Sequence, residues 1–213
     1  MRSKVMSRGV KDKSVEEVGI SGWVEVIVRD RDGRVKYHIG SPPPRPTEER
    51  ATARPSECEG GEGDCSFTSL PPSALPAKFQ DFYWRRNIIT NAGIAEVIRL
   101  VFSGLTGTKF GYIAIGTGTT AEAATDTALG YEIARKTATV TQTTTTVSGD
   151  TALLEATFSK ADGLTGTANV SEAGVLNAST GGVLLARKVF SAVPLNWDAG
   201  DSITIRYYIQ MTR

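Results

Sequence analysis

The chain has 213 residues, of which 40% are hydrophobic and 8% aromatic, and a formal net charge of +1. This length allows one domain with appendages or two small domains. The balanced charge gives no general attraction for nucleic acid or anionic lipid, so we expect neither as a partner. No run approaches the roughly 18 apolar residues of a membrane span, and no apolar stretch follows the basic residues near the N-terminus, so we expect neither a membrane segment nor a secretory signal.

The first 40 residues are expected to form an arm and a hairpin. Residues 1–19 are polar and show the period of neither a strand nor a helix, which indicates an N-terminal arm. Residues 20–40 hold two alternating runs around Asp32-Gly33, a strong signal for a β-hairpin. An isolated hairpin is only marginally stable in water, so its apolar face needs a further surface, either the C-terminal domain or another subunit. Trp23 and Tyr37 are therefore candidate interface residues.

Residues 41–78 are rich in Pro and Gly, which predicts a linker of extended or irregular chain. The linker contains the two cysteines of the chain, Cys58 and Cys65, in a loop with several carboxylates. Three interpretations stay open: a disulfide that closes the loop, reduced thiols, or a calcium site made by the carboxylates. The spacing does not match an EF-hand, and two cysteines lack the further ligands of a zinc site, so we expect no metal site and no cofactor.

Residues 79–213 are expected to form a β-rich assembly domain. Trp84, Arg85 and Arg86 stand near its start and favour a protein interface over a nucleic-acid site, because these residue types are enriched at protein contacts. Apolar residues at helical spacing predict one α-helix over residues 92–102, capped by Asn91 and closed by Gly104.

Strand-forming runs follow the predicted helix. They lie at residues 110–115, 136–147, 151–158, 170–176, 183–189 and 202–211. Strands at this short spacing leave no room for crossover helices. The sequence therefore predicts a mainly β fold, an antiparallel β-sandwich or open barrel with one α-helix, plus the N-terminal arm and hairpin.

The chain offers little catalytic chemistry. The run Gly116-Thr-Gly-Thr-Thr120 follows a predicted strand like a phosphate-binding loop, but it lacks the Lys and the following helix that such loops need. His38 is the only histidine, so a Ser/His/Asp arrangement has no further support. A glycan hydrolase with paired carboxylates such as Glu155 and Glu172 is an alternative, although the sequence does not give their separation. We expect no catalytic residues and no enzymatic activity.

Several short motifs follow one another between residues 87 and 209. They are Asn87-Ile-Ile-Thr-Asn-Ala-Gly93, the stretch at residues 110–135, Glu172-Ala-Gly174, Leu185-Ala-Arg187 and Asp201-Ser-Ile-Thr-Ile205. In their order and spacing, the chain resembles structural proteins of tailed-phage virions. The matching residues are Asn87, Asn91, Gly93, Gly116, Gly118, Leu129, Glu132, Arg135, Glu172, Gly174, Arg187 and Asp201. Residues 1–78 are not covered by the resemblance.

The resemblance implies a non-enzymatic virion protein, made in the host cytoplasm, that acts as a capsid decoration, neck or tail accessory component. Its expected partners are further copies of itself and other virion proteins, such as the major capsid or tail proteins, with the arm tying neighbours together. Glu132 with Arg135 or Arg187 is expected to form a structural ion pair, so Glu132→Ala should disturb folding or assembly. The alternative is a host-recognition module of a tail fibre or baseplate that binds a glycan or a receptor.

Overall fold

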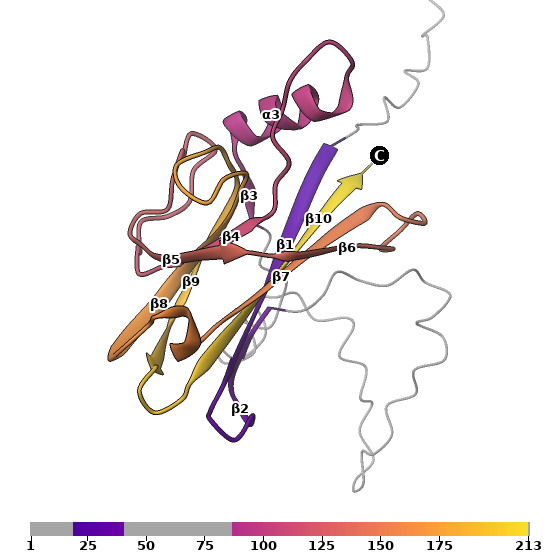
Figure 1. Ribbon diagram of the computed structural model, residues 1–213. Coiled ribbons are helices and arrows are strands. Elements are labelled where there is room, and N and C mark those ends of the chain that lie inside the picture. Colours follow the sequence, from indigo (N-terminus) through magenta and orange to yellow (C-terminus); the bar gives the residue numbers. More distant parts are fainter. Residues whose placement is uncertain (1–18, 41–86, 213) are drawn as a thin grey trace, which may run out of the picture.

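The computed structural model describes residues 19–40 and 87–212. These residues form two antiparallel five-stranded sheets packed face to face, and the described part of the chain contains one α-helix (Figure 1). The prediction of a mainly β sandwich with one helix is confirmed, and the sheets do not close into a barrel. Residues 1–18, the predicted linker with Cys58 and Cys65, and Trp84, Arg85 and Arg86 lie outside the described residues.

The strand order is β2-β1-β10-β7-β6 in the first sheet and β3-β9-β8-β4-β5 in the second. The strands of the first sheet are β1 (Gly19–Arg29), β2 (Val35–Ile39), β6 (Thr139–Thr143), β7 (Thr151–Phe158) and β10 (Ser202–Thr212). Those of the second are β3 (Ile88–Ile89), β4 (Tyr112–Gly116), β5 (Glu132–Thr137), β8 (Thr167–Leu176) and β9 (Leu184–Asn196). The helix α3 (Asn91–Val101) and the 3-10 turn η2 (Lys160–Asp162) complete the described elements.

The N-terminal hairpin is part of the first sheet. Strand β1 pairs with β10 in eleven antiparallel residue pairs, from Gly19 opposite Thr212 to Arg29 opposite Ser202. The apolar surface that the hairpin needs is therefore supplied by the same chain. Trp23 is 6% exposed and so offers little surface to a partner, whereas Tyr37 on the edge strand β2 is 41% exposed. The assignment of both as interface residues stays a prediction.

The core lies between the two sheets. Val26, Ile203 and Ile205 of the first sheet and Ile113 and Val175 of the second belong to one buried apolar cluster, each with no exposed surface. Such burial of aliphatic side chains contributes roughly 1.5–3 kcal/mol per residue.

A buried tyrosine links the two sheets across this core. Tyr207 of β10 donates its hydroxyl to the backbone oxygen of Ala173 on β8, at 2.7 Å. Burial raises the pKa of the Tyr207 hydroxyl well above its ordinary value. The hydroxyl thus keeps its proton and holds this bond.

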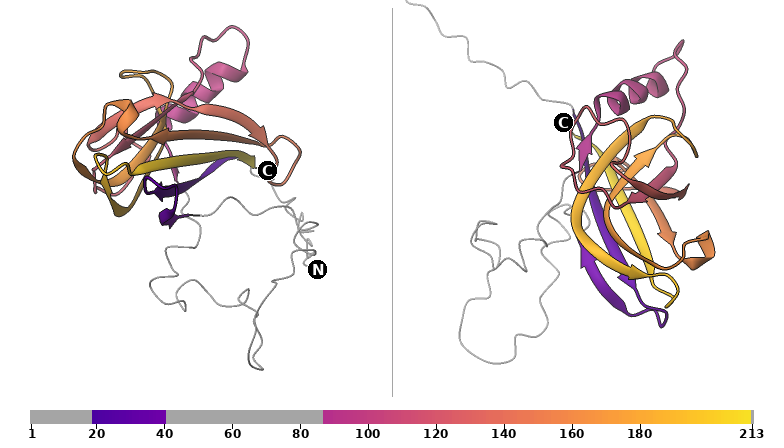
Figure 2. Two further views of the ribbon diagram at one scale, coloured as in Figure 1. Left: turned by 60° about the horizontal axis from the view of Figure 1, so that its bottom comes forward. Right: turned by 90° about the vertical axis from the view of Figure 1, so that its left-hand side faces the viewer.

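Helix α3 lies at one end of the sandwich, beside the start of β1 and the end of β10 (Figures 1 and 2). Its N-cap is Thr90, whose side-chain oxygen accepts a hydrogen bond from the N–H of Gly93 at 2.9 Å. Asn91, the predicted cap, is instead the first helical residue, because the extended backbone of Thr90 already supplies the capping oxygen. Gly104 lies in the left-handed region at φ 83°, shortly after the helix ends.

Several strand boundaries differ from the sequence prediction, and two of the differences have a clear physical reason. The predicted strand 136–147 is two strands, since β5 ends at Thr137 on the edge of the second sheet and β6 begins at Thr139 on the edge of the first. The buried Ala138 stands between them and donates its N–H to Gly111. Strand β9 also continues through Pro194, which has no N–H to donate. The proline is tolerated because β3, the neighbour on one side of β9, pairs with it only at residues 186 and 187.

Candidate functional site

Helix α3 packs on the second sheet through a glycine. A Cβ atom placed on Gly93 would lie 2.7 Å from the Cα and 2.8 Å from the backbone oxygen of Leu185 on β9. Only a residue without a side chain allows the helix to approach the strand this closely. Gly93 therefore fixes which side of α3 faces the sheet.

The same side of α3 carries a buried carboxylate. Glu96 is 5% exposed, and its Oε1 accepts hydrogen bonds from the N–H of Thr108 at 2.6 Å and from Nδ2 of Asn177 at 3.2 Å. Its Oε2 lies 3.4 Å from Nη1 of Arg99. A buried carboxylate is tolerated only with such partners. Sequence reasoning missed this role, because a glutamate away from the apolar stripe is the pattern of a solvent-facing residue.

The apolar stripe of α3 faces away from the second sheet and toward the start of β1 and the end of β10, with which it lines a cavity; only its Val97 packs against the core. In a surface helix the apolar stripe ordinarily covers the core, but here Gly93 and Glu96 are the buried residues of the helix. We call the outward surface, together with the neighbouring methionine of β10, the α3 apolar face. Its members are Ile94 (45% exposed), Ile98 (47%), Val101 (66%), Phe102 (58%) and Met211 (51%).

This exposed surface is comparable to the largest apolar patch on an ordinary single chain, which measures about 300–600 Å². At about 150–200 Å² for a fully exposed large side chain, the α3 apolar face presents on the order of 500 Å². The largest patch of a chain is often functional. The α3 apolar face is therefore the strongest candidate binding surface among the described residues.

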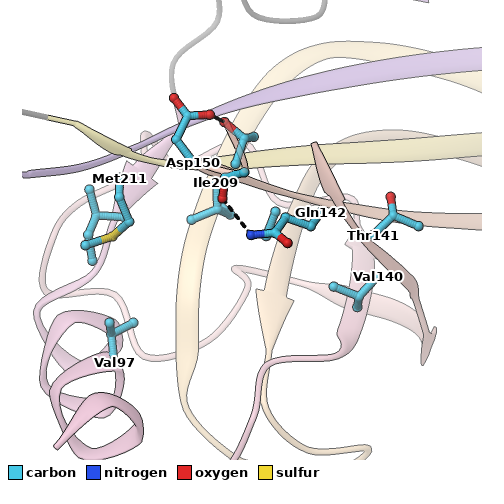
Figure 3. Close-up of a pocket in the computed structure, with 11 residues that line it drawn as sticks. Val97, Val140, Thr141, Gln142, Asp150, Ile209 and Met211 are labelled. Atoms are coloured by element: carbon cyan, nitrogen blue, oxygen red, sulfur yellow. Dashed lines mark hydrogen bonds between the residues drawn. The ribbon is translucent and has the colours of Figure 1, made fainter. Parts of the chain in front are cut away.

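Two adjoining cavities lie between α3 and the first sheet, and both are lined by Ile20, Val97 and Met211. The first, of about 360 Å³, opens toward the α3 apolar face and has only apolar side chains around it. The second, of about 450 Å³, continues into the open end of the sandwich. Figure 3 shows Val97 and Met211 on one side of the second cavity and Val140 on the other. Apolar side chains of a bound partner would fit this space.

The polar rim of the second cavity is already occupied by internal hydrogen bonds. Asp150 accepts bonds from the N–H groups of Thr145, Thr146 and Val147 and from Nε2 of Gln210. Although burial opposes the effect, these donors hold the pKa of Asp150 far below its ordinary value. Asp150 thus remains a carboxylate that closes its own turn and is a poor general base.

A second polar centre surrounds Glu172 of β8, in the second sheet. This side chain has no exposed surface. Its Oε1 accepts from the N–H groups of Gly118 at 2.9 Å and Tyr131 at 2.6 Å. Its Oε2 accepts from the N–H of Gly130 at 2.9 Å and from Nε and Nη2 of Arg187 at 2.9 and 2.7 Å. One carboxylate therefore ties both ends of the loop at residues 117–131 to strand β9.

Arg187 extends this centre to the middle of the same loop. Its Nη1 donates to Asp126 at 2.8 Å, and its Nη2 donates to the backbone oxygen of Thr120 at 3.1 Å. Burial opposes the charged forms, but these contacts outweigh it: they lower the pKa of Glu172 and Asp126 and raise that of Arg187. All three groups stay charged at neutral pH and act as a structural clamp.

The glycine-rich run at residues 116–120 resembles a phosphate-binding loop in sequence, but of its backbone groups only the N–H of Gly118 donates to an anion. In the structure that anion is the protein's own Glu172, which occupies the N–H groups of Gly118, Gly130 and Tyr131. A phosphate would have to displace a buried, paired carboxylate. The contact with Glu172 therefore explains the glycine-rich loop without a bound nucleotide.

The residues proposed for the structural ion pair separate into two groups. Glu132 pairs with Arg135 at 2.6 Å, and Arg135 also donates to the backbone oxygens of Ala178 and Gly181, both at 2.8 Å. Arg187 does not contact Glu132 and instead pairs with Glu172. The sequence named the right residue types but could not assign the partner of Arg187.

The carboxylates considered for glycan hydrolysis do not share a site. Glu155 lies on β7 of the first sheet and pairs with Arg206, whereas Glu172 lies buried in the second sheet. His38 lies 2.7 Å from Glu25 through its Nε2. Within residues 19–40 and 87–212, no group of three or more His, Cys, Asp or Glu side chains is placed to hold a metal ion. No helix in these ranges is long and apolar enough to cross a membrane.

A search against protein-family models, curated proteins and solved structures found no match in any of the three. The resemblance that the short sequence motifs suggest therefore stays a prediction.

Proposed function

We propose that the protein is a non-enzymatic structural subunit of a virus particle of the tailed-phage type, a capsid decoration, neck or tail accessory component that works by binding other protein chains. The observation that carries this proposal is the outward-facing apolar stripe of α3. It offers a protein partner about 500 Å² of apolar surface at one end of a rigid sandwich. In this function the bound partners are further copies of the chain and other virion proteins.

The Glu172 clamp supports the same proposal. It uses a buried ion pair and three backbone hydrogen bonds to hold a loop in place, and it leaves no reactive group open to a substrate. Buried polar networks of this kind rigidify a protein when every member is satisfied. A rigid subunit with one apolar contact surface suits assembly better than it suits turnover.

The test is to collect virus particles from cells that produce this protein, purify them by density gradient, and quantify its peptides by mass spectrometry. We expect the chain to co-purify with intact particles in a fixed ratio to the main shell or tail protein. Its recovery only in the particle-free fraction would refute a structural role in the virion. Binding of the purified protein to cell-surface glycans, with particles that still assemble when it is deleted, would favour the host-recognition alternative.

A further inference from the structure

We propose that the α3 apolar face is a self-association surface, on which a second copy of the chain docks its own α3 apolar face across a two-fold axis. This inference rests on the proposed function, because it names the partner and the surface through which a structural subunit first assembles.

The orientation of α3 is fixed by the chain and is costly to change. Turning the stripe inward would bring a side chain against Leu185, where only Gly93 fits. It would also turn Glu96 away from Thr108 and Asn177, whose N–H groups would lose their acceptor. Asn177 is 6% exposed, and leaving such a buried donor unpaired costs more than a hydrogen bond normally contributes. The apolar side chains therefore stay outside until another molecule covers them.

The size of the surface fits a protein partner. A standard interface buries about 800 Å² on each partner, with about 65% of it apolar at homodimer contacts. The α3 apolar face supplies on the order of 500 Å² of apolar surface, which matches that apolar share.

The α3 apolar face is compatible with a two-fold contact between copies. In a two-fold contact, each residue near the axis meets the same residue of the other copy, so a central charge would be repelled. All members of the α3 apolar face are uncharged. Arg99, on the same helix, is held by Glu96 at 3.4 Å.

The packing of two such helices follows a common pattern. Ile94, Ile98 and Phe102 are spaced four residues apart and form one ridge. Ridges of this spacing interdigitate when two helices cross. Val101 is the most exposed member of the face, at 66%, and lines the adjoining 360 Å³ cavity.

The N-terminal segment of the chain is the competing occupant, since it reaches the described residues at Gly19, which also lines the first cavity. Residues 1–18 carry eight charged side chains: Arg2, Lys4, Arg8, Lys11, Asp12, Lys13, Glu16 and Glu17. Placing so many charges on an uncharged apolar surface is unfavourable. The second copy is therefore the better match.

The test compares two lysine substitutions at valines in the full-length protein. Val101→Lys changes the α3 apolar face (Val101 is 66% exposed), whereas Val35→Lys changes a valine that is 51% exposed on the distant edge strand β2. Lysine is favourable near a helix C-terminus, so Val101→Lys should leave the monomer folded, as circular dichroism would show. Ile98→Lys is a second variant on the same face, in case the first misfolds.

Mass is measured by light scattering and analytical ultracentrifugation over a range of concentrations. The unmodified protein and Val35→Lys are expected to reach twice 22.7 kDa. Val101→Lys and Ile98→Lys are expected to raise the dissociation constant at least about a hundredfold, because each change acts twice in a two-fold dimer.

Cross-linking tests the symmetry. In a chain with Cys58→Ser and Cys65→Ser, an added Ile98→Cys should form a disulfide with its own copy, and Val35→Cys should not. A monomer at every concentration, an odd-numbered assembly, or a dimer that survives both lysine variants would overturn the inference. If the chain is nevertheless found in particles, the proposed function stands and another surface assembles it. If it is absent from particles, the proposed function fails whatever its mass in solution.

Discussion

The buried carboxylate of Glu172 gives the sharpest stability prediction. In Glu172→Gln, an NH2 group replaces one of the two carboxylate oxygens, each of which accepts hydrogen bonds from at least two N–H groups. Two or more of these donors therefore lose their acceptor, whichever way the amide is oriented. Breaking a buried ion pair by removing one partner costs about 3–5 kcal/mol. Asp126 still pairs with Arg187 at 2.8 Å, so we expect the lower end, about 3 kcal/mol. For a chain of this size, that lowers Tm by about 6–12 °C.

Urea denaturation followed by circular dichroism at pH 7 measures this loss. The matched control is Glu132→Gln, which makes the same change in an ion pair that is partly open to solvent, with the Glu132 side chain 30% exposed. An exposed pair contributes up to about 1 kcal/mol. If Glu172→Gln costs no more than Glu132→Gln, the clamp does not hold the loop and the reasoning is wrong. The structure thus makes Glu172, and not Glu132, the residue whose substitution should cost more stability.

Three further predictions concern the stability contributed by Glu172, Gly118 and Gly93. The pKa of Glu172 is lowered in the folded state, so the unfolded chain binds more protons as the pH falls. The free energy of unfolding should therefore decrease as pH drops below about 4.5, and less steeply in Glu172→Gln. Urea titrations that give the same pH dependence for both proteins would contradict this. Gly118→Ala should cost about 2 kcal/mol, since its Cβ would lie 2.7 Å from Cδ of Glu172, whereas Gly111→Ala, with nothing within 4 Å, should change stability by less than about 0.5 kcal/mol. Gly93→Ala should push α3 away from Leu185 and cost about 1–2 kcal/mol by denaturation, despite the better helix propensity of Ala; a stabilised variant would show that the close approach is unimportant.

The strands were largely predictable because their signals are local. The alternating runs around Asp32-Gly33 predict β1 and β2, and the run from Ser202 predicts β10. Strand β5 begins at Glu132, earlier than predicted, because its sequence Glu-Ile-Ala-Arg-Lys lacks a clear apolar run. Its pairing with β4 therefore comes from its neighbours more than from its own pattern.

The candidate sites were less predictable because they depend on distant contacts. The periodicity of residues 92–102 predicts a helix, but not that its apolar side faces outward. That outcome depends on a glycine contact with Leu185 and on donors to Glu96 from Thr108 and Asn177. Likewise, Arg187 meets Glu172 through the pairing of β8 with β9, which no local spacing reveals.

The adjacency of the first and last described strands also decides how the molecule responds to mechanical load. Strands β1 and β10 are antiparallel neighbours, with Gly19 opposite Thr212 at one end. Their hydrogen bonds lie perpendicular to the strands. A force that pulls Gly19 and Thr212 apart therefore acts on one residue pair at a time and separates β1 from β10 pair by pair. A pull between Ile39 and Thr212 has no such weak line, because these residues lie toward opposite ends of the first sheet. An attachment at Gly19 and Thr212 would therefore open the first sheet at a lower force than an attachment at Ile39 and Thr212.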